Sequence, residues 1–112
     1  MLFFCLSGAV ASPLQASQAE RVAAGARLAH EVNKGNCLAC HAMPTDKSAI
    51  TSATVGPPLV GIAARFPDRA QLRLQIWDAS RFNPGTVMPP FGRNKILSEE
   101  DIELILDYLY TL

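Results

Sequence analysis

The sequence predicts an all-α domain, and three observations lead to that prediction. Apolar residues recur at helical spacing near both ends of residues 20–112, little of the chain between them reads as strand, and a Cys-x-x-Cys-His run follows the first helical stretch. The 112 residues include ten basic and ten acidic side chains, so the net charge is zero. We therefore expect one small domain without the basic surface that would predict a nucleic-acid partner.

The first nineteen residues have the features of a secretion signal. Residues 1–10 are mostly apolar and small residues follow, so a signal peptidase could cut after Ala11 or after Ala19. No basic residue precedes Arg21, which suggests that the signal begins upstream of Met1. The apolar run is too short to span a bilayer. We expect a signal peptide over 1–19, a mature domain over 20–112 and no membrane span in the mature chain.

The first helix is predicted over Glu20–Lys34, where apolar residues fall near helical spacing and Gly35 supplies a stop. Gly25 lies inside this helix and costs about 1 kcal/mol relative to Ala in an exposed helix interior. A close crossing with another helix would explain that glycine, although simple tolerance is the alternative.

Cys37, Cys40 and His41 form the run that predicts the chemistry of the chain. Two thiols at this spacing can form thioethers with a porphyrin, and the adjacent imidazole is then held beneath the iron. A zinc site would need further ligands, and outside the run the chain offers only Cys5 and His30. A redox dithiol would follow a strand in a βαβ unit, whereas a helix precedes this run. The run therefore predicts one covalently bound haem c.

The middle of the chain reads as loop followed by a short helix. Residues 43–58 are polar and interrupted by Pro and Gly, so we expect a loop that wraps the haem edge. A short helix with an uneven apolar face is predicted over Asp68–Ala79. A chain of this size makes a thin core, so the haem would form part of it and the apoprotein would be poorly folded.

The last helix begins at Ser98, where Ser98 and Asp101 resemble a capping box with Asp in place of Glu. Its apolar residues fall at i, i+3, i+4 and i+7, namely Ile102, Ile105, Leu106 and Leu109.

Met88 is the predicted distal ligand. Met43 lies too close to His41 in sequence to reach across the ring, and Met1 lies in the leader. Met88 sits in the proline-rich loop 83–92, which can hold a thioether rigidly against iron. The competing candidate is His30. Two protein ligands leave no open position on the iron and favour single-electron transfer.

Residues around the ligands carry weaker predictions. The carbonyl of Pro57 could accept the Nδ1 proton of His41 and fix its tautomer, or Pro57 could be an ordinary loop residue. Apolar residues of the Met88 loop could form a partner surface or pack on the porphyrin; they are Phe82, Val87, Pro89, Pro90 and Phe91. Cations flanking the loop could meet the haem propionates or remain solvated; they are Arg81, Arg93 and Lys95.

Four segments together resemble a known family. They are residues 35–41, which contain the Cys-x-x-Cys-His run, residues 55–59 with Gly-Pro-Pro, residues 83–92 with Met-Pro-Pro-Phe-Gly, and residues 108–112. This combination resembles the sulfur-oxidation cytochromes SoxX over nearly the whole mature chain. The resemblance implies a class I cytochrome c fold, with N- and C-terminal helices crossing and loops wrapped around one haem. It also implies that Cys37 and Cys40 bind haem covalently and that His41 and Met88 ligate iron.

The same resemblance implies a role in sulfur oxidation. SoxX proteins pair with a haem-bearing SoxA subunit in a periplasmic L-cysteine S-thiosulfotransferase. This enzyme joins thiosulfate to a cysteine of the SoxYZ carrier, and SoxX receives the released electrons before a downstream acceptor does. No catalytic residue is expected on this chain, because Cys37 and Cys40 would be consumed by thioethers and Cys5 lies in the leader. A freely diffusing monohaem electron carrier is the alternative, and a five-coordinate haem enzyme or gas sensor is a third possibility.

Overall fold

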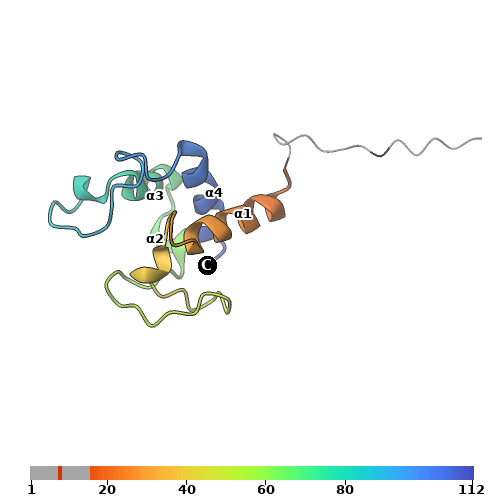
Figure 1. The fold of residues 1–112 in the computed structure, drawn as a ribbon, viewed down its shortest axis with the longest axis horizontal. Coiled ribbons are helices and arrows are strands. Elements are labelled where there is room, and N and C mark those ends of the chain that lie inside the picture. The colour runs from red at the N-terminus through yellow and green to blue at the C-terminus, as the bar shows by residue number, and fades with distance from the viewer. Residues whose placement is uncertain (1–7, 9–15) are drawn as a thin grey trace, which may run out of the picture.

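A computed structural model describes Gly8 and residues 16–112, so most of the expected signal peptide lies outside the described residues. Over the described part, the chain forms helices and loops without a strand (Figure 1). This confirms the all-α prediction. The α-helices are α1 (Gln18–His30), α2 (Ile62–Arg65), α3 (Arg69–Trp77) and α4 (Glu99–Leu109), with short 3-10 helices at Cys37–Ala39 and Ala79–Arg81.

Helix α1 starts where Ser17 caps it, with the Ser17 hydroxyl accepting a hydrogen bond from the Glu20 backbone N–H at 3.1 Å. It ends at His30, so the predicted end at Lys34 was wrong. The chain after His30 turns back on the helix, and the N–H of Gly35 donates to the carbonyl of Leu28 at 3.0 Å. Turn hydrogen bonds therefore replace the last predicted helical turn and bring the chain round to Cys37.

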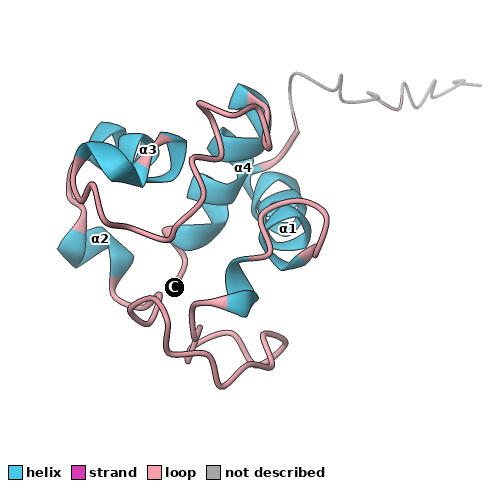
Figure 2. Cartoon of the chain, turned by 60° about the vertical axis from the view of Figure 1, so that its left-hand side comes forward, coloured by secondary structure: helices cyan, strands magenta, loops and turns pink. Residues whose placement is uncertain are grey.

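Helices α1 and α4 pack against each other, and their ribbons lie side by side in both views (Figure 1, Figure 2). The contact is closest at Gly25 of α1. A Cβ at Gly25 would lie 1.9 Å from the carbonyl oxygen of Leu104 and 2.9 Å from Cβ of Tyr108. No side chain fits into that space. The close crossing anticipated from the sequence is therefore present, and it brings the two ends of the domain together.

Helices α3 and α4 form close to their predicted positions. Asp68 caps α3 by accepting from the Ala70 N–H at 2.9 Å, and the helix stops at Trp77, two residues before the predicted Ala79. The capping box of α4 is present, with Ser98 and Asp101 each accepting from the other's backbone N–H. The single turn α2 was not predicted, and its Ile62 is completely buried.

One carboxylate links three helices. Asp107 of α4 accepts from Nε of Arg21 in α1 at 2.7 Å and lies 2.9 Å from Nη2 of Arg69 in α3. Its side chain is only 10% exposed, so both ion pairs are partly shielded from water. The largest fully buried side chains of the described residues are Ile62, Ile102, Ile105 and Leu106, which belong to α2 and α4. Among the described residues, no helix is long and apolar enough to cross a membrane.

Candidate haem site

A cavity of about 760 Å³ opens between the helices and the long loops. It is within the range of about 300–1,000 Å³ that is usual for ligand and cofactor pockets. Its lining includes every residue predicted for the site: Cys37, Cys40, His41, Pro57 and Met88. The rest is largely apolar and comes from α2, α3, α4 and the loops, including Ile62, Leu72, Phe91, Ile105 and Leu109. The residues present therefore fit a large, mainly apolar cofactor.

The Cys-x-x-Cys-His run reaches the cavity through a tight turn. Asn36 adopts a left-handed conformation with φ of 47°, and the one-turn helix Cys37–Ala39 follows it. The N–H of His41 then donates to the carbonyl of Cys37 at 2.9 Å. This hydrogen bond brings the imidazole round to the same cavity as the two sulfur atoms.

Cys37 and Cys40 both line the cavity, and no disulfide joins them. Burial raises the pKa of Cys37 to about 11, so its sulfur is a neutral thiol at physiological pH. A neutral sulfur in an apolar wall is compatible with a thioether, which carries no charge. It is less suited to a thiolate, which would need nearby cations.

The His41 ring is held by a neighbouring loop. Its Nδ1 lies 2.6 Å from the carbonyl oxygen of Pro57, the contact anticipated from the sequence. A carbonyl can only accept, so Nδ1 carries the proton and Nε2 keeps the lone pair that an iron ion requires. The loop is itself fixed by backbone hydrogen bonds from Gly56 N–H to the Cys40 carbonyl at 2.7 Å and from Leu59 N–H to the Ala42 carbonyl at 2.8 Å.

Gly56 is a site residue that sequence reasoning missed. A Cβ at this position would lie 2.3 Å from Cε1, 2.6 Å from Nδ1 and 2.7 Å from Nε2 of His41. The ring therefore lies directly against the glycine backbone. The only sequence signal was its place in the Gly-Pro-Pro run at residues 56–58, which was interpreted as part of a loop and as one of the segments that resemble SoxX, without a role for the glycine itself.

Met88 lies half-buried in the loop between Phe82 and Leu97. Two short turns shape its approach to the cavity. The N–H of Thr86 donates to the carbonyl of Asn83 at 3.0 Å, and the N–H of Met88 donates to the hydroxyl of Thr86 at 3.1 Å. These turns fix the backbone on the N-terminal side of Met88, while Pro89 and Pro90 restrict it on the other side.

His30 and Met43, the other sequence candidates for an iron ligand, do not line the cavity. Nε2 of His30 lies 3.1 Å from the hydroxyl of Tyr108, and that hydroxyl lies 3.4 Å from Sδ of Met43. The Tyr108 hydroxyl also donates to the carboxylate of Asp46. These side chains tie the segment after His41 to α1 and α4, which is a structural role.

The apolar residues of the Met88 loop divide between two environments. Phe91 is buried and lines the cavity together with Val87 and Pro89, whereas Phe82 is exposed and does not line it. Val32, Val55, Val87 and Ile96 line the cavity yet remain exposed, so they mark its opening to solvent. Of the three cations beside the loop, Arg93 forms an ion pair with Asp78 at 2.8 Å.

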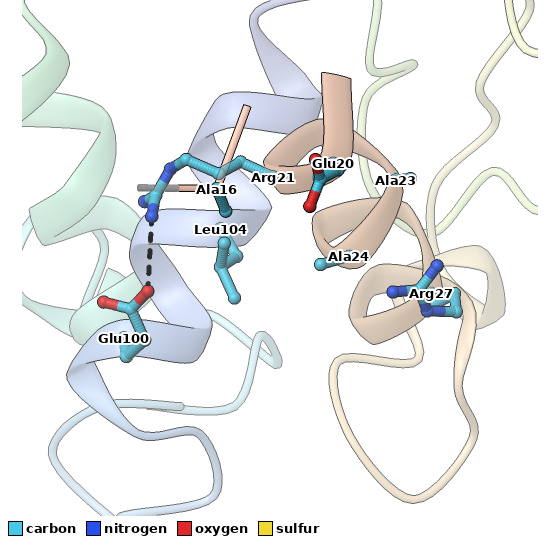
Figure 3. Close-up of a pocket in the computed structure, with 8 residues that line it drawn as sticks. All are labelled: Ala16, Glu20, Arg21, Ala23, Ala24, Arg27, Glu100 and Leu104. Carbon is cyan, nitrogen blue, oxygen red and sulfur yellow. Dashed lines mark hydrogen bonds and ion pairs between the residues drawn. The ribbon is translucent and has the colours of Figure 1, made fainter. Parts of the chain in front are cut away.

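A second hollow of about 410 Å³ lies on the outside of the α1–α4 crossing (Figure 3). Its lining includes Glu20, Arg21, Arg27 and Glu100, and the ion pair between Arg21 and Glu100 spans it at 3.4 Å. It contains none of the residues predicted for the site. The chemistry of the cysteine run is therefore confined to the larger cavity.

Comparison with known proteins supports this assignment. A family model described as "Cytochrome C oxidase, cbb3-type, subunit III" matches residues 20–109. The chain belongs to this cytochrome c family. It is also similar to a chain described as "Crystal structure of SoxXA from P. pantotrophus", with 28% sequence identity and a TM-score of 0.70 over 80% of this chain and 79% of that one. No curated protein matched the sequence.

These comparisons confirm two predictions. The fold is that of a cytochrome c, and the chain is a SoxX-like cytochrome. Membership of a cytochrome c family implies a covalently bound haem c, and the spacing of Cys37 and Cys40 is consistent with it. The roles of the individual residues stay predictions.

Proposed function

We propose that this chain is a periplasmic monohaem cytochrome c that accepts electrons as a subunit of a SoxAX-type complex. The observation that carries the proposal is that Cys37, Cys40, His41 and Met88 all line the same apolar cavity. These residues come from two separate segments of the chain, and the fold brings them together. The similarity to the SoxXA structure adds the partner.

Each of these residues has a separate task. Cys37 and Cys40 would attach the haem covalently through thioethers, and His41 would present Nε2 to the iron while Pro57 holds the Nδ1 proton. Met88 would supply the thioether ligand that completes the coordination. Bound in this way, the haem would take up and release one electron at a time. The surrounding apolar side chains would exclude water and favour the reduced state.

The sulfur chemistry would take place on a partner. Residues 20–112 contain only the two cysteines of the haem-binding run, so this chain keeps no thiol for a substrate sulfur atom. In the proposed complex, a SoxA-type subunit would complete the L-cysteine S-thiosulfotransferase, and a SoxYZ carrier would supply the cysteine that receives thiosulfate. This chain would pass the released electrons to a downstream acceptor.

The opening of the cavity offers a route for those electrons. Exposed apolar side chains surround it, with Val32 74% and Val87 79% exposed. An apolar rim can be covered by a partner protein, which would place a second redox centre close to the haem edge. A freely diffusing carrier could use the same rim for brief contacts with several partners, so the rim alone does not distinguish the two functions.

Isolation of the native complex tests the proposal. The haem protein should be purified from the periplasmic fraction and examined for a second haem-bearing subunit and for haem reduction on addition of thiosulfate and a SoxYZ carrier. We expect a stable heterodimer whose haem is reduced only when both additions are present. A monomer that exchanges electrons with several proteins and ignores thiosulfate would support the free carrier. A five-coordinate iron spectrum would instead support a haem enzyme or sensor.

A further inference from the structure

The loop that carries Met88 is closed at its base. It leaves α3 after Trp77 and returns at Gly92 and Arg93, where both backbone N–H groups donate to the Trp77 carbonyl, at 3.1 Å and 3.2 Å. Residues 78–93 thus form a loop whose ends meet, near the upper limit of the about 6–16 residues typical of compact Ω-loops. Met88 lies inside this loop, ten residues after Asp78 and five before Arg93.

An ion pair between a buried carboxylate and a guanidinium whose side chain is 55% exposed joins the same two ends. The side chain of Asp78, at the start of the loop, is only 7% exposed and lies 2.8 Å from Nη1 of Arg93 at its close. The other oxygen of Asp78 accepts from the backbone N–H and the hydroxyl of Ser80, so the carboxylate also caps the short helix Ala79–Arg81. Arg93 is the one cation in an ion pair with Asp78 among the described residues.

The fit between the two ends is close. A Cβ at Gly92 would lie 2.0 Å from Cε3 and 2.2 Å from Cδ2 of Trp77, so the indole ring packs directly on the returning backbone. The guanidinium of Arg73 lies 5.3 Å from the centre of the Trp77 ring on α3. The two ends of the loop are therefore held together by side-chain packing and by an ion pair, whereas residues 81–85 of the loop are exposed.

We propose that Asp78 and Arg93 are positioning residues for Met88, and that their ion pair keeps the loop closed so that the Met88 thioether stays in the cavity. This inference rests on the proposed role of Met88 as the distal iron ligand. If Arg93 is lost, the buried Asp78 carboxylate loses its ion-pair partner, and the state in which the loop has opened becomes more populated. Met88 would then leave the cavity more often without unfolding of the helices.

Competition with imidazole measures how often the loop opens. Imidazole added to the ferric holoprotein can occupy the iron only when Met88 has withdrawn, so its apparent affinity reports the open population. The displacement is followed by loss of the weak near-infrared sulfur-to-iron absorption band. We expect Arg93→Ala to bind imidazole roughly tenfold more tightly than wild type, because the buried Asp78 carboxylate has lost its charged hydrogen-bond donor.

Two further variants separate positioning from simple destabilisation. Arg93→Lys keeps the positive charge and should restore most of the wild-type behaviour. Asp78→Asn keeps an oxygen for Ser80 but removes the ion pair, so it should change imidazole affinity in the same direction as Arg93→Ala. The matched control is Arg27→Ala, which removes an exposed cation from α1, outside this loop, and should leave the affinity unchanged.

The outcomes distinguish this inference from the proposed function. If the wild-type band is present and Arg93→Ala binds imidazole no more tightly, the inference fails although the ligand assignment stands. The same holds if urea unfolding shows a weaker domain while imidazole affinity is unchanged, since the pair would then be merely structural. If the wild-type ferric protein lacks the band, the assignment of Met88 fails and this inference fails with it.

Discussion

At the scale of single residues, the position of the His41 ring depends on the space that its neighbours leave for it. The His41 imidazole packs on a glycine backbone, and the only polar contact of its Nδ1 recorded among the described residues is the Pro57 carbonyl. Sequence reasoning identified His41 from the Cys-x-x-Cys-His spacing and suggested Pro57. Gly56 escaped it, because a glycine beside two prolines is equally typical of any turn.

The packing of Gly56 predicts a specific defect. Gly56→Ala would place a methyl group within 2.3 Å of the His41 ring, so the ring must shift or the loop must move. We expect a lower yield of haem-loaded protein and a loss of about 1–3 kcal/mol in unfolding free energy, typical of overpacking. Haem absorbance per mole of purified protein measures the first effect, and urea unfolding measures the second.

Gly85→Ala is the matched control, because its added Cβ would meet only Oδ1 of Asn83, at 3.7 Å. Equal haem yields from the two variants would show that the His41 ring does not need the space beside Gly56.

The two internal methionines give a second residue-scale prediction. Met88→Ala should abolish the near-infrared sulfur-to-iron band and lower the reduction potential, because a thioether ligand stabilises the reduced iron. Met43→Leu should leave both unchanged, since Met43 is buried beside Tyr108 and does not line the cavity. Absorption spectroscopy and redox titration measure the two properties. If Met43→Leu lost the band and Met88→Ala kept it, the distal ligand would have been misassigned.

At the scale of elements, local signals located the helices but not all of their ends. The capping box of Ser98 and Asp101 set the start of α4 correctly, because it acts within four neighbouring residues. The end of α1 was misplaced because a turn formed by Gly35 and Leu28 competes with the last helical turn. Helix α2 was missed, since a single turn around Ile62 is stabilised by burial that no short sequence window shows.

The α1–α4 crossing gives a prediction at this scale. Gly25→Ala should destabilise the domain by about 1–3 kcal/mol, because the new methyl group would force the helices apart. In an exposed helix the same change would stabilise by roughly 0.5–1 kcal/mol. Ala23→Gly, at an exposed position of α1, is the control and should cost only about 0.5–1 kcal/mol. Urea unfolding of the holoproteins compares them, and a stabilised Gly25→Ala variant would contradict the close packing.

The segment after His41 is anchored by a cluster that responds to pH. Hydrogen bonds from Ser48 and then Tyr108 hold the pKa of Asp46 below its usual value, and His30 lies 3.6 Å from the same carboxylate. A carboxylate whose pKa is lower in the folded than in the unfolded protein stabilises the folded state at pH values above its unfolded pKa of about 3.9. This stabilisation is lost as the pH falls through the pKa of the folded state.

Asp46→Asn should therefore destabilise the domain near neutral pH, and the difference from wild type should shrink at strongly acid pH. Urea unfolding at several pH values measures this. Glu31→Gln is the control, because Glu31 is exposed and its carboxylate has no recorded ion pair among the described residues. If the difference in unfolding free energy between Asp46→Asn and wild type does not change with pH, the charge of Asp46 does not contribute to stability.

At the scale of the whole molecule, the cavity occupies space that a core would normally fill. Side chains from α2, α3 and α4 that belong to the buried core also line it, among them Ile62, Leu72 and Ile105. The sequence could predict the need for a cofactor from the small size of the chain and from its cysteine run. It could not predict which core residues would face the cofactor, because that depends on long-range packing.

Loss of the two cysteines that would attach the haem should therefore weaken the side-chain packing of the domain. A Cys37→Ser/Cys40→Ser variant purified without haem should keep much of its helical signal but lose fixed side-chain packing, because apolar walls around an unfilled core collapse imperfectly. Far- and near-ultraviolet circular dichroism with binding of a hydrophobic dye would measure this. Sharp, cooperative unfolding equal to that of the haem-loaded wild type would show that the polypeptide alone suffices.

The shared carboxylate of Asp107 has a consequence for how the molecule tolerates mutation. Replacing either Arg21 or Arg69 alone leaves one positive and one negative partner, which still attract each other. Replacing Asp107 removes the carboxylate that both arginines share, so Arg21 keeps only its pair with Glu100 and Arg69 only its pair with Glu103. The three positions are therefore unequal: a substitution at either arginine breaks one of the two links through Asp107, whereas a substitution at the aspartate breaks both at once.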